Sequence, residues 1–233
     1  MTLALPNVIA IDGEAASGKS TIGRLLADRL GYLYFDTGVM YRAVTWVALQ
    51  RGLDLADQSA LTALAEALTI EVVPPTQDDG RQYTVYADGQ DVTWAIRQPE
   101  VDAAVPMVAA YPGVRQALTP QQRAVAEKQR VVMVGRDIGT VVMPDAPLKL
   151  YMRASVEERA RRRYRERQSR GETISYAEVL ESMRQRDQTD SQRQYAPLRQ
   201  APDAVVIDTD GLSIEEVLAK ILDLLAQRSE RHG

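Results

Sequence analysis

The sequence predicts an α/β protein in which a parallel sheet is flanked by helices. Short apolar runs alternate with helical patterns along the 233 residues, and a turn or helix signal follows each run. Runs that are apolar throughout are typical of parallel strands with both faces covered. The expected strands are Val8–Ile11, Tyr32–Phe35, Val131–Val134, Leu148–Met152 and Ala204–Ile207.

The composition fits a protein with a sizeable core and narrows the classes of partner. The apolar fraction is 45%, the charged fraction is 26%, and no apolar run approaches the roughly 20 residues of a membrane span. A net charge of −4 argues against a general nucleic-acid binder. The chain contains no cysteine and shows no signal-peptide pattern, so we expect a cytoplasmic protein without nucleic-acid or membrane partners.

The loop after the first expected strand matches a phosphate-binding pattern, and a helix from Thr21 to about Leu30 follows it. In the pattern G-x-x-x-x-G-K-[ST], successive backbone N–H groups point at one anion, the lysine reaches the β/γ-phosphates and the hydroxyl reaches Mg²⁺. The sequence therefore predicts a P-loop NTPase core that binds a nucleoside triphosphate, with Ser20 as the metal ligand. The matching residues are Gly13, Glu14, Ala15, Ala16, Ser17, Gly18, Lys19 and Ser20.

A phosphate loop alone leaves motor, switch, pump and kinase open. A regulatory GTPase normally reads guanine with an Asn-Lys-x-Asp segment, and Asn7 is the only asparagine of this chain. That count excludes the usual switch protein. A large ATPase would need coupling domains for which 233 residues leave little room.

Residues 57–129 break the alternation of the parallel sheet and predict a second lobe. Ile70–Val73 and Tyr83–Ala87 are expected antiparallel strands, and Asp88-Gly89 is a hairpin turn that leads into a third. The segment Thr93–Gln129 is expected to be helical. Its interruptions are placed near Pro99, Pro106, Pro112 and Pro120.

A helix rich in arginine is expected over Ser155–Gly171. Arg159, Arg162 and Arg163 share one face at i, i+3 and i+4, and Glu166 is the only carboxylate within the arginine run. The guanidinium groups are therefore expected to lack local partners. A solvated basic helix is one interpretation. The other is a lid that brings these three arginines onto the triphosphate.

Three further segments place arginines and carboxylates at the ligand edge of the sheet. They are Asp36-Thr37-Gly38 with Arg42, Gly135-Arg136-Asp137, and Arg186-Asp187 with Asp190 and Arg193. Singly, each has an ordinary structural interpretation: a helix cap, a loop ion pair or a salt-bridged helix stripe. Together they predict a second anion site that faces the first, because arginine suits a bidentate grip on phosphate.

With these motifs in place, the chain resembles the bacterial cytidylate kinases, the (d)CMP kinases of the nucleoside monophosphate kinase group. The resemblance covers nearly the whole chain. It is carried by Ile9-Ala10-Ile11-Asp12-Gly13, Asp36-Thr37-Gly38-x-x-Tyr41-Arg42, Val108-Ala109-Ala110-x-Pro112-x-Val114-Arg115, Gly135-Arg136-Asp137-Ile138-Gly139-Thr140-Val141-Val142, Pro144-Asp145-Ala146-Pro147 and Ala196-Pro197-Leu198.

The resemblance implies phosphoryl transfer from ATP to CMP or dCMP, with Mg²⁺, by a monomer. It divides the chain into a P-loop core (1–56, 130–152 and 196–233), a nucleoside monophosphate (NMP)-binding lobe with a small antiparallel sheet (57–129) and a helical LID (153–195).

The family pattern also implies a role for individual residues. ATP contacts would come from Gly13 to Thr21, joined by Arg159, Arg162 and Arg163 of the lid. The acceptor's phosphate would meet Thr37, Arg42, Arg136 and Arg193, its sugar Arg186 and Asp190, and its base Arg115 and Asp137. Catalysis would rest on Lys19, Arg136 and Arg193.

One position departs from the family pattern. Pro106 stands where these kinases usually have a serine near the base, so tolerance of UMP is an open question. A kinase for UMP, dTMP or a phosphate-free alcohol is an alternative, and a non-catalytic nucleotide-binding regulator is another.

Overall fold

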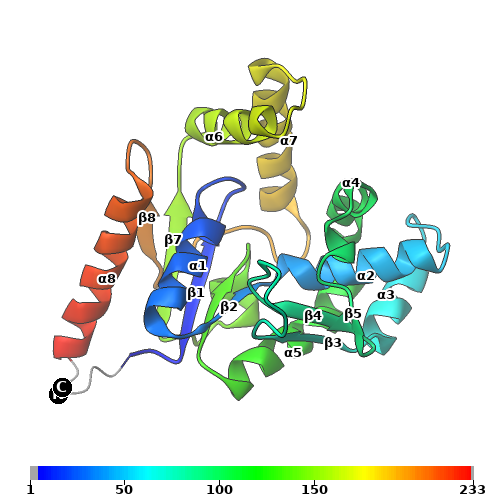
Figure 1. Ribbon diagram of the computed structural model, residues 1–233, viewed down its shortest axis with the longest axis horizontal. Helices are drawn as coiled ribbons and strands as arrows, with labels where there is room; N and C mark the ends of the chain where they lie inside the picture. Colours follow the sequence, from blue (N-terminus) through cyan, green and yellow to red (C-terminus); the bar gives the residue numbers. More distant parts are fainter. Residues whose placement is uncertain (1–4, 232–233) are drawn as a thin grey trace.

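The structure, a computed structural model, describes residues 5–231 and contains two sheets with helices around them (Figure 1). The larger sheet has five strands in the order β2-β6-β1-β7-β8, and every neighbouring pair is parallel. Its strands are β1 (Val8–Gly13), β2 (Leu33–Asp36), β6 (Val131–Val134), β7 (Leu148–Arg153) and β8 (Val205–Asp208). The α/β fold and its expected strands are confirmed.

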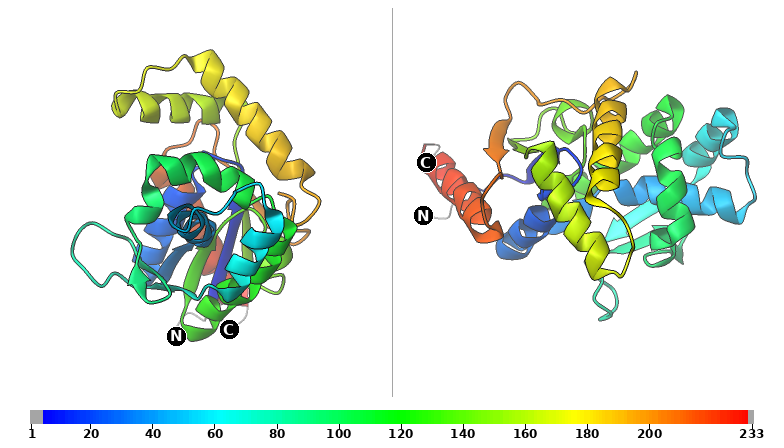
Figure 2. Two further views of the ribbon diagram at one scale, coloured as in Figure 1. Left: turned by 90° about the vertical axis from the view of Figure 1, so that its right-hand side faces the viewer. Right: turned by 90° about the horizontal axis from the view of Figure 1, so that it is seen from above.

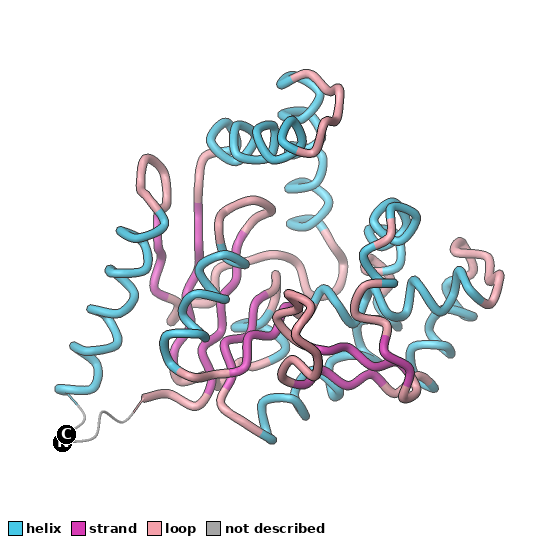
Figure 3. Tube along the Cα trace, viewed as in Figure 1, coloured by secondary structure: helices cyan, strands magenta, loops and turns pink. Residues whose placement is uncertain are grey.

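Helices α1 (Lys19–Leu30) and α8 (Ile214–Arg231) pack against each other, and α1 lies against β1, β2 and β6 (Figures 1 and 3). The start of α8 is fixed by a capping box. The Ser213 N–H donates to the Glu216 carboxylate at 2.7 Å, and the Glu216 N–H donates to the Ser213 hydroxyl at 3.2 Å.

The parallel arrangement gathers the predicted motifs at one edge. The phosphate loop follows the carboxyl end of β1. Asp36-Thr37 lies at the carboxyl end of β2, and Gly135-Arg136-Asp137 follows that of β6, so all three motifs lie at one edge of the sheet. The ladder continues into these loops, since Gly135 N–H donates to Ile11 C=O and Thr37 N–H donates to Val134 C=O, each at 3.0 Å. The three loops are therefore held in register by the backbone itself.

The second lobe contains an antiparallel sheet in the order β3-β4-β5, as the sequence predicts. Its buried residues join the core of the large sheet in one continuous cluster, to which Leu61, Val85 and Val114 belong. The elements from α2 onward are α2 (Gly38–Gln50), α3 (Gln58–Ala67), β3 (Ile70–Val73), β4 (Thr84–Ala87), β5 (Gln90–Asp91), η1 (Ala95–Arg97), α4 (Pro99–Val108) and α5 (Pro112–Lys128).

Two of the four expected proline interruptions are wrong. Pro99 and Pro112 begin α4 and α5, but Pro106 and Pro120 lie inside these helices. Both interior prolines are exposed. Their rings and the carbonyls they leave unbonded can therefore face water, and the helices continue through them.

Two helices stand apart beyond the ligand edge of the sheet: α6 (Val156–Ser169) and α7 (Tyr176–Gln192) (Figures 1 and 2). They pack on each other through a small apolar cluster of Ala160, Val179 and Met183, which also includes Ala15 of the phosphate loop. The lid helices thus rest on the loop that they are expected to cover. No helix in residues 5–231 is long and apolar enough to cross a membrane.

Candidate active site

The phosphate loop connects β1 to α1 through a tight backbone that requires glycine at two points. Gly13 has φ +149°, and a Cβ atom there would lie 2.1 Å from the Met152 carbonyl oxygen of β7. Gly18, the N-cap of α1, has φ +91°. This geometry brings the N–H groups of the loop and of the first turn of α1 to one place, where an anion also meets the positive end of the helix.

Lys19 lies buried at the start of α1, and its ammonium group donates to the Glu14 carbonyl oxygen at 2.7 Å. Burial, and next the charge of Arg136, lower the pKa of Lys19 well below its usual value. The protein therefore holds a desolvated cation against a neutral oxygen. A phosphate group arriving there would relieve that cost.

Two oxygens beside this lysine could hold a hard cation. Ser20 donates its hydroxyl to Asp36 Oδ2 at 3.5 Å. In residues 5–231 no group of three or more His, Cys, Asp or Glu could hold a metal by itself. Mg²⁺ is commonly bound by one or two protein oxygens together with substrate phosphates, so this sparse oxygen pair fits it.

Asp190, buried near the end of α7, joins two of the predicted arginines. Arg136 donates Nε–H to Asp190 Oδ2 at 2.9 Å, and Arg193 forms an ion pair with Asp190 Oδ1. Nε and Nη1 of Arg193 are buried, and no described residue accepts from them. Buried guanidinium donors without an acceptor mark a place for an anion, because leaving them unsatisfied is costly.

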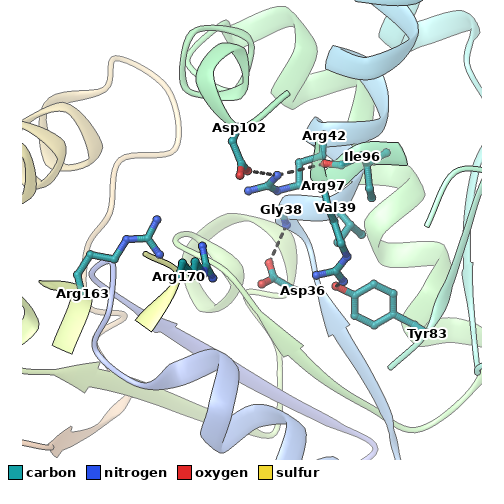
Figure 4. A pocket seen from close by; sticks show the side chains of 10 residues that line it. All are labelled: Asp36, Gly38, Val39, Arg42, Tyr83, Ile96, Arg97, Asp102, Arg163 and Arg170. Atoms are coloured by element: carbon teal, nitrogen blue, oxygen red, sulfur yellow. Dashed lines mark hydrogen bonds and ion pairs between the residues drawn. The ribbon is translucent and has the colours of Figure 1, made fainter. Parts of the chain in front are cut away.

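Arg42 projects from α2 toward α4. It forms an ion pair with Asp102 and donates to the Ile96 carbonyl oxygen at 3.1 Å (Figure 4). Thr37, immediately before α2, donates its buried hydroxyl to the Val134 carbonyl oxygen at 3.1 Å. Thr37 is thus held at the end of β6 and Arg42 against the second lobe, and both have protein partners.

Arg115 and Asp137 form a buried ion pair at 2.8 Å between α5 and the loop after β6. The Arg115 guanidinium also lies 5.0 Å from the centre of the Tyr41 ring and donates to the Ala109 carbonyl oxygen. Burial opposes the charge, but Tyr41 and Asp137 raise the pKa of Arg115. The pair offers a fixed donor and a fixed acceptor side by side.

The cations of the two predicted sites act on one another. Burial and then Arg115 and Arg136 lower the pKa of Arg193 to about 10. Desolvation and the charges of Arg136, Arg163 and Arg42 lower the pKa of Arg186 to about 10, although its side chain reaches solvent. The charges of Arg136 and Arg186 also lower the pKa of Lys19. The cations therefore form one continuous cluster from the phosphate loop to α7. A bound polyanion would neutralise it.

The expectation that the lid arginines largely lack local partners is wrong for Arg162 and Arg163, which pair with carboxylates of their own helix. Arg159 grips Asp187 of α7 with two bonds (2.9 and 2.6 Å) and donates to the Ala15 carbonyl oxygen at 3.3 Å. Arg162 pairs with Glu158 and donates to the Thr209 carbonyl oxygen at 2.7 Å, while Arg163 pairs with Glu166. Three of these partners, Asp187, Ala15 and Thr209, come from distant segments that the local sequence of the helix does not reveal.

A hollow of about 420 Å³ lies between the lid helix α6 and the second lobe (Figure 4). Arg42 and Arg163 line it, together with Arg97 and Arg170, which the sequence analysis did not select. Arg97 lies over the Tyr83 and Trp94 rings, and Arg170 pairs with Glu166. Neither belongs to a strand-end motif, which explains why sequence reasoning missed them.

The cytidylate kinase family model matches residues 9–227. The chain belongs to the cytidylate kinase family.

Relatives that match over nearly the full length of the chain support this family assignment. The cytidylate kinase of Herpetosiphon aurantiacus is 53% identical over 229 residues, which are 98% of each chain. That of Bacillus licheniformis is 47% identical over 223 residues, or 96% of this chain and 97% of the relative. A solved structure of an uncharacterized protein from Eubacterium ventriosum has a similar fold, with a TM-score of 0.50 at 12% identity over 94% of this chain and 98% of that one.

Proposed function

We propose that this cytidylate kinase family member transfers the terminal phosphoryl group of ATP to CMP or dCMP, giving ADP and CDP or dCDP. One observation carries the proposal. The cation of the phosphate loop, Lys19, lies within the electrostatic reach of Arg136, which shares Asp190 with Arg193 and its unsatisfied donors. Two phosphate-bearing substrates can therefore meet in one cationic site.

The chemistry needs alignment and charge neutralisation rather than a general base. The second pKa of a phosphate monoester is about 6, so at neutral pH the acceptor is largely a dianion and already nucleophilic. Lys19, Arg136 and Arg193 would neutralise the charge on the transferring oxygens. The lid arginines Arg159, Arg162 and Arg163 would help to exclude water, because their helix rests on the phosphate loop.

Mg²⁺ would be held by the Ser20 hydroxyl, near Asp36, with the remaining ligands from ATP and water. When bound, it would withdraw charge from the β- and γ-phosphate oxygens. The protein's own part is to present the hydroxyl on the first turn of α1, beside Lys19.

Base selection would rest on Arg115 and Asp137. The cytosine N4 amino group can donate to the Asp137 carboxylate, while N3 and O2 can accept from Arg115. Uracil has an acceptor and a donor in the reversed order, so it would leave buried groups unpaired. Pro106 lies exposed on α4 and offers no hydroxyl to the base. We therefore place the selection on the ion pair alone.

The sugar would meet Arg186 and Asp190. Asp190 already accepts from Arg136 and Arg193. A carboxylate has about four acceptor sites, so a ribose or deoxyribose hydroxyl can still donate to it.

An assay that couples ADP formation to NADH oxidation, with CMP, dCMP, UMP, AMP and shikimate as acceptors, tests the proposal. We expect turnover with CMP or dCMP. Turnover with shikimate or AMP alone would reject it in favour of another small-molecule kinase.

A non-catalytic regulator makes a different prediction, namely nucleotide binding without ADP formation for every acceptor. Arg42→Ala and Arg193→Ala separate the roles further. Unchanged transfer in both variants would remove these arginines from the acceptor site.

We further propose a monomer that acts in the cytoplasm. The absence of cysteine and the net charge of −4 are compatible with this assignment. Sedimentation at several protein concentrations tests the monomer, with a single species near 25.8 kDa as the expected result.

A further inference from the structure

Asp12, the residue before Gly13 on β1, is a buried carboxylate that no role assigned above uses. Its two oxygens accept from consecutive backbone N–H groups: Ile138 donates to Oδ1 and Gly139 donates to Oδ2, each at 2.7 Å. Such short bonds to a charged acceptor are among the stronger hydrogen bonds in proteins.

These bonds join the two halves of the site. Asp12 leads directly into the phosphate loop, and Ile138 and Gly139 begin η2 (Ile138–Val142) directly after Arg136 and Asp137. The approach is close, because a Cβ atom on Gly139 would lie 3.3 Å from Asp12 Oδ2 and 3.1 Å from Lys149 Cδ. Any change in these bonds therefore alters the position of the acceptor-side residues relative to the donor loop.

We propose that Asp12 is a positioning residue for phosphoryl transfer, and that only its carboxylate form fixes Arg136 and Asp137 at the working distance from the phosphate loop. The proposal rests on the function proposed above. Asp12 does not touch either substrate. It acts through the backbone of Ile138 and Gly139.

The charge state of Asp12 is finely balanced. Burial raises its pKa to about 6, against the opposing effect of the two N–H groups; Asp137 raises it further and Lys19 lowers it. Burial lowers the pKa of Arg136 and raises that of Tyr151, and the charge of Asp12 acts to raise both. The methylene groups of Lys149 pack against Gly139 beside it. As pH falls through 6, the carboxyl gains a proton, and one oxygen becomes a donor that faces a backbone donor.

The sign of the linkage separates this effect from acid unfolding. The pKa of Asp12 is higher in the folded protein than in the unfolded chain, so protonation of this group favours the fold. Its contribution to the free energy of unfolding rises as pH falls through 6. Loss of turnover caused by protonation of Asp12 would therefore reflect the position of Arg136 and Asp137, because protonation of this group does not favour unfolding.

The test compares the wild type with Asp12→Asn between pH 5.5 and 8. The asparagine amide presents N–H groups to a backbone N–H, so at pH 8 we expect kcat with CMP to fall about 10- to 100-fold. The Kd of a fluorescent ATP analogue should change less than threefold. The ratio of wild-type to variant kcat/KM should decline as pH falls below 6, and the titration of CMP itself cancels in that ratio.

Asp223→Asn, on α8, is the matched control, since it removes one exposed carboxylate far from the site. It should leave the pH profile unchanged. A pH-independent ratio for Asp12→Asn, or an equal loss of ATP-analogue affinity, would overturn the proposal.

A second measurement needs no variant. The ¹⁵N–¹H signals of Ile138 and Gly139 in the wild-type protein should shift together with a midpoint near pH 6. Signals that stay constant from pH 5 to 7.5 would reject the proposed protonation. This titration does not depend on kinase activity. A wild type without CMP turnover would refute the proposed function, while the titration would still decide whether Asp12 responds.

Discussion

The phosphate loop and the acceptor cluster hold their cations in different ways. Lys19 rests on a neutral carbonyl oxygen. In the acceptor cluster, by contrast, Arg42, Arg115, Arg136 and Arg193 each pair with a carboxylate. The carboxylates of Asp36 and Glu14 act on Lys19 only through their charges, so a phosphate at the loop would meet a cation that no described carboxylate binds directly. The proposed acceptor, by contrast, would take arginine donors that are partly engaged.

This difference assigns the two halves different tasks. A buried cation without a directly bound carboxylate favours any phosphate and would supply affinity and transition-state charge. Arginines already paired with carboxylates bind well only to a ligand that supplies comparable negative charge in the right geometry. They would therefore supply selectivity among acceptor substrates. Four substitutions would break or sharpen the comparison.

The largest effect is expected at Lys19. In Lys19→Met nothing replaces the buried cation, so kcat should fall about 10³-fold or more. Steady-state kinetics with CMP measures this, and calorimetry should find the Kd for CMP within about threefold of the wild type. Lys220→Met, exposed on α8, is the control. A loss below tenfold would show that Lys19 is not the principal cation.

Arg193→Ala comes next. It removes the unsatisfied donors but leaves the Arg136–Asp190 bond, so we expect kcat/KM for CMP to fall about 100-fold. The exposed Arg199→Ala, six positions along the chain, should be neutral. If both variants behaved alike, Arg193 would have no special place in the acceptor site.

A smaller effect is expected for Asp137→Asn, and it concerns selection. Loss of the carboxylate removes the acceptor for the cytosine amino group, so the ratio of kcat/KM for CMP over UMP should narrow about tenfold. Asp78→Asn, in an exposed loop of the second lobe, serves as control. An unchanged ratio with reduced turnover for both substrates would mean that Asp137 supports Arg115 without reading the base.

The smallest effect is expected at Asp102, whose side chain is 54% exposed. A solvent-exposed ion pair is worth about 1 kcal/mol at most, so Asp102→Asn should free Arg42 and lower KM for CMP about two- to fivefold, with kcat unchanged. The change should shrink at high salt. Glu100→Gln on the same helix is the control. A higher KM would instead mean that Asp102 orients Arg42 productively.

The sequence predicted much of this site because its motifs follow strands that end at one edge. Gly13, Asp36 and Arg136 are brought together by the parallel register, which the apolar runs already imply. The distant partners of Arg159 and Arg162 could not be found in this way. Asp187 and Thr209 meet them only after α6, α7 and β8 are packed.

Two further features could not be predicted from the sequence, for physical reasons. Pro106 and Pro120 are helix breakers by propensity, yet solvent on one side of α4 and α5 satisfies the carbonyls they leave free. Asp12 ends a strand in sequence, and nothing local shows that both its oxygens bind a segment more than one hundred positions away. Tertiary contacts decide both cases.

The apolar footing of α6 and α7 on Ala15 has an energetic consequence. Because Ala15 belongs to the triphosphate cradle, the ordering of that cradle and the ordering of the covering helices are coupled parts of one cooperative unit. A nucleotide that ordered the cradle would therefore also order the covering helices, and the conformational entropy of both would be lost in one step.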